Sequence, residues 1–197
     1  TVLLENVGLY IENFSGIPYT DDENAILMRF GKVFQQTYTR FLDLQKAEEQ
    51  AREAQIEAGL ERVRSRSMAM HKSDELEQVV EVLTDQFRML NSNTVTCWIA
   101  LVNVETNTME IWNHTDMGSP KSNYTVNGKD YHTFQSDIDA FKNKERFRQF
   151  SFEKEAAKRI LKEQLEFELV VPEESRDYHQ LHYRHNFGFI GYASWSQ

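Results

Sequence analysis

The chain has 197 residues, of which 40% are hydrophobic and 12% aromatic, so it can build a core and is not a disordered protein. Its net charge of −9, from 22 basic and 31 acidic residues, argues against nucleic-acid binding, which requires a basic surface. No apolar run approaches the roughly 18 residues of a membrane span. The single cysteine, Cys97, excludes an internal disulfide. We expect a cytoplasmic protein without nucleic-acid or direct membrane contacts.

Residues 1–19 lack the run of secondary-structure elements expected at the start of a domain. Residues 7–14 are predicted to form a lone strand, followed by a turn at residues 15–18. The segment Asn6-Val7-Gly8-Leu9 aligns with Asn186-Phe187-Gly188-Phe189 at an offset of 180 residues. Such an offset, close to the chain length, predicts a piece of a tandem array, in which residues 1–19 are the terminal strand and turn of a preceding domain.

Residues 20–72 predict one long connector helix. Thr20 and Glu23 have capping-box spacing, and no proline follows until residue 120. At about 1.5 Å per residue, a helix of about 50 residues would be about 75 Å long. That is too long to bury its apolar stripe inside a single globule of this size. Two shorter helices folded back at Gly59 are the alternative.

An apolar stripe with heptad spacing runs along this predicted helix and requires a partner helix, most simply the same helix of a second chain in a parallel homodimer. Alanines form a thin seam in its middle. Because alanine buries little area, this seam can hold two close-lying registers and relay a shift, although a fixed spacer is the alternative. The predicted interface consists of Leu27, Phe30, Phe34, Thr37, Phe41, Leu44, Ala51, Ala54, Ala58, Leu60, Val63 and Met70.

Residues 73–197 predict a separate domain. It opens with a helix at about residues 74–90, for which Ser73 or Asp74 is the expected N-cap. Residues 94–104, rich in β-branched and aromatic types, and residues 109–113 predict a hairpin. A second hairpin is predicted where residues 122–126 and 131–134 flank Asn127-Gly128.

Further short elements are predicted in the rest of the domain, while the secondary structure of residues 173–185 is ambiguous. Because local hairpins exclude a doubly wound parallel sheet, the predicted fold class is α+β, with a mainly antiparallel sheet and flanking helices after a long coiled-coil helix. The further elements are helices at residues 137–144 and 153–167 and strands at residues 147–152 and 187–195.

Two segments resemble a known family. The glycine-aromatic strand, the turn at Pro18 and the acidic helix start Tyr19-Thr20-Asp21-Asp22-Glu23 resemble the C-terminal end of a GAF domain. Residues 51–76, which include Gly-Leu-Glu-Arg-Val-Arg-Ser-Arg-Ser-Met-Ala-Met-His-Lys, are similar to connector helices that precede GAF-like domains in bacterial sensors. Sensor histidine kinases are the commonest such proteins and nucleotide cyclases the second. The resemblance implies cytosolic parallel dimers that relay conformational signals to an effector domain, with residues 73–197 as a GAF-like domain truncated near its end.

Four aromatic residues are candidates to line a small-molecule pocket, which in GAF-like folds lies on one face of the sheet. Core packing explains them equally well. The Asn-Lys-Phe-Asp signature of the cyclic-nucleotide-binding members is absent from the sequence. The four candidates are Trp98, Trp112, Tyr131 and Phe134.

Three histidines, His179, His182 and His185, are spaced so that they would approach one metal ion if the segment were helical. No cysteine supports such a site, and ordinary hydrogen-bonded histidines are the alternative. Cys97 is expected to be a buried structural thiol. Because no nucleophile or acid–base constellation is recognisable, we expect no enzyme activity, metal or cofactor. The sequence predicts a dimeric signal-relay module, with a ligand-binding sensor domain as the alternative.

Overall fold

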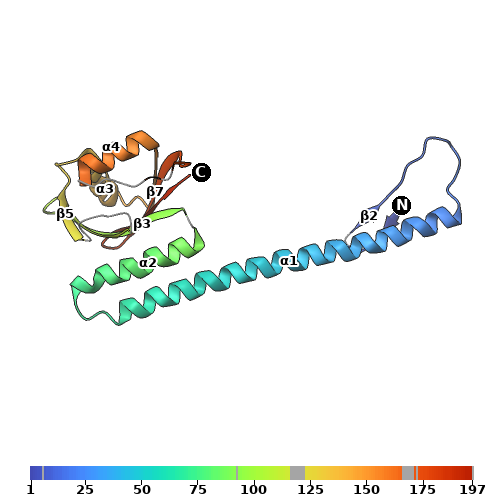
Figure 1. The fold of residues 1–197 in the computed structure, drawn as a ribbon, viewed down its shortest axis with the longest axis horizontal. Coiled ribbons are helices and arrows are strands. Elements are labelled where there is room, and N and C mark those ends of the chain that lie inside the picture. Colours follow the sequence, from blue (N-terminus) through green and yellow to red (C-terminus); the bar gives the residue numbers. More distant parts are fainter. Residues whose placement is uncertain (6, 92, 116–122, 166–170, 172, 197) are drawn as a thin grey trace. The chain divides into compact units, whose positions relative to one another are not determined.

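The computed structural model describes residues 1–197 except residues 6, 92, 116–122, 166–170, 172 and 197 and the side chains of residues 163–165. The chain divides into two compact units, residues 1–56 and residues 57–197. Figure 1 shows the helices and strands in chain order. Among the described residues, no helix is both long and apolar enough to cross a bilayer.

The first unit contains a two-stranded antiparallel ribbon and most of the long helix. The ribbon pairs β1 (Val2–Leu3) with β2 (Gly8–Leu9). The strand predicted at residues 7–14 is therefore wrong in its length. Beyond β2, the Asn13 side-chain amide donates a hydrogen bond of 3.1 Å to the Ile17 carbonyl. Local side-chain bonds of this kind turn a chain instead of extending it.

Helix α1 (Asp21–Met68) begins at the predicted capping box. The Thr20 N–H and hydroxyl donate to Glu23 Oε2 at 2.8 and 2.9 Å, and the Glu23 N–H donates to Thr20 Oγ1 at 3.3 Å. The hydrogen bond from the Thr20 N–H, followed by that from its hydroxyl, lowers the pKa of the Glu23 carboxyl below its ordinary value. The helix continues through Gly59, so the alternative of two helices folded back at this residue is wrong.

Replacing Thr20 with alanine is expected to loosen the first turn of α1 and to lower the exchange protection of the Glu23 amide about fivefold. Because folding lowers the pKa of Glu23, its contribution is complete above the unfolded pKa and is lost as the pH falls through the lower folded value. Hydrogen exchange followed by NMR at two pH values measures both effects. Thr20→Ser keeps the hydroxyl and serves as the control. Equal protection in the alanine variant would contradict the capping box.

The connection that follows α1 is held by Glu75. A short 3-10 turn, η1 (Ser73–Glu75), leads into the next helix, and no side-chain hydrogen bond caps either element in the described chain. The N-cap predicted at Ser73 or Asp74 is therefore wrong. Instead, the His71 N–H donates to Glu75 Oε2 at 3.1 Å, because the glutamate side chain is long enough to reach back to the linker.

The second unit is built on a six-stranded sheet in the order β5-β4-β3-β8-β7-β6, and every neighbouring pair is antiparallel. This confirms the predicted α+β class, in which an antiparallel sheet follows a long helix. The strands are β3 (Thr94–Asn103), β4 (Thr108–His114), β5 (Asn123–Asn127), β6 (Phe147–Glu153), β7 (Asp177–His185) and β8 (Gly188–Trp195).

The first predicted hairpin is present as β3 and β4, whereas the second predicted hairpin is wrong. Its first strand exists as β5, but residues 131–134, the expected partner strand, open helix α3 (His132–Lys142). The Gly128 N–H donates to the Asn107 carbonyl at 2.9 Å, which ties the turn to the neighbouring loop. The helix then buries Ile138 completely, a tertiary gain that outweighs the local turn signal.

Helices cover both faces of the sheet (Figure 1). Helix α2 (Leu76–Leu90) packs on one face, where the Phe87 ring lies 5.1 Å from that of Tyr192. Helix α4 (Lys154–Leu165) covers the opposite face together with α3, and its predicted end at residue 167 lies outside the described residues. Ala193, the neighbour of Tyr192 in β8, points to the α4 side because side chains alternate along a strand.

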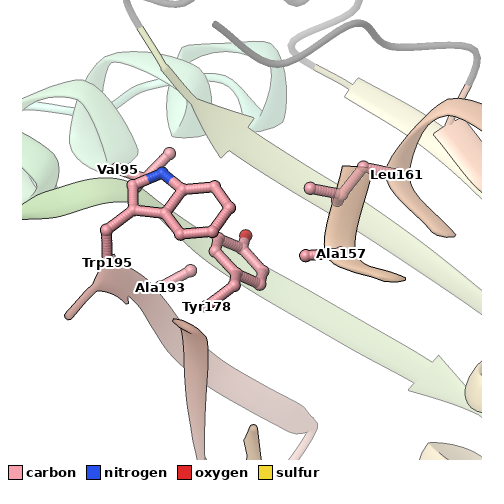
Figure 2. Packing of buried hydrophobic residues seen from close by; sticks show 6 residues of the cluster. All are labelled: Val95, Ala157, Leu161, Tyr178, Ala193 and Trp195. Atoms are coloured by element: carbon pink, nitrogen blue, oxygen red, sulfur yellow. The ribbon is translucent and has the colours of Figure 1, made fainter. Parts of the chain in front are cut away.

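The core beneath α4 is one of two apolar clusters on that face. Figure 2 shows the rings of Tyr178 and Trp195 next to each other, with Ala157 and Leu161 approaching from α4. The two ring centroids are 4.9 Å apart. Trp98 packs against this cluster and also against the second cluster, which lies under α3. The space around Trp98 therefore lies between the two cores.

Candidate functional site

A cavity of about 120 Å³ lies between the sheet and helices α3 and α4. Its walls are mainly aromatic and aliphatic, with a few polar side chains among them. Small-molecule sites have this composition: an apolar enclosure with a small number of placed polar groups. The polar groups of the wall decide what this cavity can hold.

Five residues form one row across this face of the sheet. By register, Asn113 on β4 lies opposite Trp98 on β3, and Trp98 lies opposite Gly191 on β8. Gly191 in turn lies opposite His182 on β7, which lies opposite Arg148 on β6. Directly opposed residues of paired strands point to the same face. In this row, Asn113 lies on one side of Trp98. His182 and Arg148 lie on the other side, beyond Gly191.

Gly191 brings Trp98 and His182 together. A Cβ atom at residue 191 would lie 2.5 Å from ring atoms of Trp98, so only glycine leaves room for the indole there. With no side chain between them, the rings of Trp98 and His182 meet edge to face at 5.1 Å, although their strands are not neighbours. The glycine thus allows the Trp98 ring to pack directly against the His182 imidazole, and both rings line the cavity.

His182 is the most constrained polar residue of the cavity. It is 6% exposed, and its Nδ1 atom lies 3.4 Å from Asp137 Oδ1. Within the described part of the chain, its Nε2 atom is buried and has no hydrogen-bond partner. A neutral imidazole carries one ring proton. A carboxylate beside Nδ1 favours the proton on that nitrogen, which leaves Nε2 as an acceptor.

Asp137 on α3 is held by Arg148 of β6. The two form an ion pair whose side chains are 11% and 13% exposed, and the guanidinium also donates to Ser136 Oγ at 2.7 Å. The Phe150 ring lies 4.8 Å beneath the guanidinium. The negative charge beside His182 is therefore neutralised within the protein, and it is not available to a charged ligand.

Within the described chain, Asn113 is the second residue of the cavity wall with a buried polar atom that lacks a partner. Its Oδ1 atom makes no hydrogen bond to any described residue. An unpaired buried amide oxygen costs on the order of 1–3 kcal/mol. Together with His182 Nε2, the described part of the cavity wall therefore presents two unsatisfied hydrogen-bond acceptors.

Two tyrosines of the cavity wall are neutral over the physiological pH range. Burial raises the pKa of Tyr178 to about 12 and raises that of Tyr124 further. Both hydroxyls therefore keep their protons. They supply shape and hydrogen bonding, and neither is suited to act as a general base near neutral pH.

Two of the four aromatic residues predicted for a pocket line this cavity, namely Trp98 and Phe134. Trp112 does not, because it is one residue out of phase with Asn113 on β4 and so points to the α2 face. Tyr131 lies beside the cavity and packs edge-on against Phe134, with ring centroids 5.7 Å apart.

The three predicted histidines are separated by strand geometry. Residues 177–185 form β7, so His182 points to the cavity face, while His179 and His185 point to the other face. His179 shares a hydrogen bond of 2.9 Å with Ser151 Oγ, and burial lowers the pKa of His185. The helical spacing that would have brought all three to one metal ion does not occur.

The predicted pairing stripe of α1 is exposed over most of the first unit. Phe30, Phe34, Phe41 and Leu44 are 47–59% exposed, and Thr37 is also exposed. Ile26 and Val33, absent from the predicted set, extend the same face. Leu27 differs: it is 7% exposed, one turn before Gly31, whose backbone faces Val2 and Leu4.

The rest of the stripe is less uniform. The seam alanines, Ala47, Ala51, Ala54 and Ala58, are exposed, and so is Leu60. Val63 and Met70 are half-buried in the second unit. There, Arg62 of α1 donates a hydrogen bond of 2.7 Å to Gln86 Oε1 of α2, so part of this helix packs within its own chain.

Several residues in and behind the cavity wall could not be predicted as site residues from the sequence. Asn113, Asp137 and Arg148 come from three separate elements and meet only through strand register and helix placement. Gly191 carried a signal, since a glycine inside an otherwise apolar and aromatic strand marks a close approach. For His182, the sequence indicates only a metal ligand.

No protein-family model matches the chain, and no curated protein is similar to it in sequence.

Proposed function

We propose that the chain is a signalling module of a bacterial multidomain sensor, working in the cytoplasm. In this proposal, α1 pairs with the same helix of a second copy in parallel and relays conformational changes between GAF-like domains. The module performs no chemistry of its own. Histidine kinases and, second, nucleotide cyclases are the proposed parent proteins. The resemblance of residues 51–76 to connector helices supports this assignment.

The observation that carries the proposal is the exposed apolar face of α1. Six apolar residues between residues 26 and 44 lie on one side of a continuous helix, each at least 47% exposed. A contiguous apolar patch of this kind is unfavourable in water and marks an interaction surface. Its heptad spacing matches the seam of a two-stranded coiled coil, in which the partner is a second copy. The exposed alanines that follow offer a weakly held seam suited to a shift of register.

A cysteine at residue 37 tests both pairing and orientation. In a parallel, in-register dimer, core positions meet their own copies, so Thr37→Cys should form an intermolecular disulfide under mild oxidation. A non-reducing gel measures the cross-linked fraction, which should include most of the protein. The native Cys97 does not interfere, since burial raises the pKa of its thiol to about 12 and keeps it protonated.

Thr39→Cys is the matched control, because residue 39 is exposed and lies on the opposite side of the helix. Equal cross-linking at both positions would indicate random collision. A dimer in light scattering that cross-links at neither position would overturn the parallel orientation. A monomer at tens of micromolar would overturn the proposal.

A small-molecule sensor is the second candidate function, and a specific observation favours it. Among the described residues, two buried acceptor atoms of the cavity have no partner, His182 Nε2 and Asn113 Oδ1. Buried polar groups in folded proteins are normally hydrogen-bonded, and an exception calls for a bound group. In this reading, a ligand supplies the missing hydrogen bonds, and its presence is the signal.

A further inference from the structure

The chemistry of the cavity specifies a class of ligand. Both unpartnered atoms are acceptors: Nε2 of His182, whose other ring nitrogen faces Asp137, and the amide oxygen of Asn113. An acceptor is satisfied only by an N–H or O–H group. A ligand that completes the cavity must therefore carry at least one such donor.

The size of the cavity fits about one ring. An engineered apolar cavity of about 150 Å³ in another protein binds benzene. The volume here is about 120 Å³. Trp98, Phe134 and Phe189 supply aromatic wall on the sheet and on α3, which suits a flat, apolar body.

The electrostatics of the cavity favour a neutral ligand. Among the described residues of its wall, Asp137 is the one with a carboxylate or fixed cationic group, and Arg148 already pairs with it. A charged ligand would be desolvated here without a free counter-ion, at considerable cost. A neutral molecule incurs no such cost.

We infer that the cavity binds a neutral, single-ring molecule that donates an O–H or N–H hydrogen bond to His182 Nε2 while its ring packs beside Trp98. This inference rests on the small-molecule sensor candidate proposed above, and it names the ligand class. Phenol represents the class, and toluene has nearly the same shape but lacks the donor.

Titration of the full chain with phenol and with toluene, followed by NMR, tests the inference. In the native chain phenol should bind about tenfold more tightly than toluene, since only phenol satisfies the buried acceptor. In His182→Phe this preference should be lost, because the hydroxyl no longer meets the Nε2 acceptor beside Trp98. His182→Gln, which restores an acceptor oxygen, should recover the preference for phenol.

His179→Phe is the matched control, since it makes the same replacement on the same strand but on the opposite face. This change should leave the preference for phenol intact. Circular dichroism of each variant shows that the fold is retained. If His182→Phe does not fold, the His182→Gln variant and the phenol-to-toluene ratio of the native chain still decide the question.

The outcomes separate the ligand class from the sensor function. Equal binding of both probes, unaffected by His182, would overturn the donor class and leave a ligand-binding cavity. Binding of neither probe, with no co-purified mass in native mass spectrometry, would overturn the class and the sensor candidate together. A co-purified neutral ring compound with a donor would support the inference, and any other co-purified compound would overturn the class alone.

Discussion

Replacing Arg148 with methionine is expected to lower the free energy of unfolding of residues 57–197 by about 3–5 kcal/mol. The guanidinium pairs with Asp137 and donates to Ser136 Oγ at 2.7 Å, in a site where both members of the pair are nearly buried. Without it, the Asp137 carboxylate is left as an uncompensated buried charge beside His182. Urea unfolding followed by circular dichroism measures the loss.

Two further variants show whether the buried charge is the cause. In Arg148→Met combined with Asp137→Leu, no charge is left unpaired, so most of the stability should return. Lys142→Met removes the exposed ion pair between Lys142 and Asp139 at 3.4 Å and should cost less than about 1 kcal/mol. If Arg148→Met costs no more than Lys142→Met, the buried pair does not stabilise the unit.

Gly188→Ala is expected to destabilise the second unit by about 3 kcal/mol, at the upper end of what overpacking costs. A Cβ atom at residue 188 would overlap the carbonyl oxygen of Ala100 on β3. The obstacle is backbone, which cannot rotate away as a side chain can, so β3 and β8 would have to separate at the centre of the sheet. Thermal unfolding of the variant measures the effect.

Gly8→Ala is the natural control, because Gly8 aligns with Gly188 in the short internal repeat and likewise opens a strand. A Cβ atom at residue 8 would meet only the Leu3 side chain, at an ordinary 3.5 Å. We therefore expect a change of less than about 0.5 kcal/mol, as at most surface positions. Similar losses at both glycines would show that backbone crowding at β3 is not the cause.

Local signals in the sequence were sufficient for some elements of the fold. The capping box of Thr20 and Glu23 and the long helix behind it depend on neighbouring residues, and both are present. The hairpin of β3 and β4 likewise follows from residue types on either side of a short turn. The start of α3 was not predictable in this way, because the burial of Ile138 depends on a sheet formed by distant segments.

The candidate site was predictable only in part, for a related reason. Trp98 and Phe134 could be chosen as large aromatic residues, but the face on which Trp112 lies depends on a one-residue phase within β4. The pairing of His182 with Asp137 requires the placement of α3 over β7, which no spacing in the sequence encodes. Strand register and tertiary packing therefore decide which candidate residues come together in one site, and neither can be read from the sequence.

The central pairing of β3 with β8 also governs how the second unit is made. These are the first and last strands of the sheet in chain order, so during synthesis β3, β4 and β5 leave the ribosome long before β8 exists. Until then one edge of β3 is unpaired and can template pairing with another chain. Such late, non-local closure is slow and leaves nascent chains open to aggregation. A chain that stops before residue 188 would yield at most the three strands β5-β4-β3 and the two strands β7-β6, each with an open edge, and it would depend on chaperones for protection.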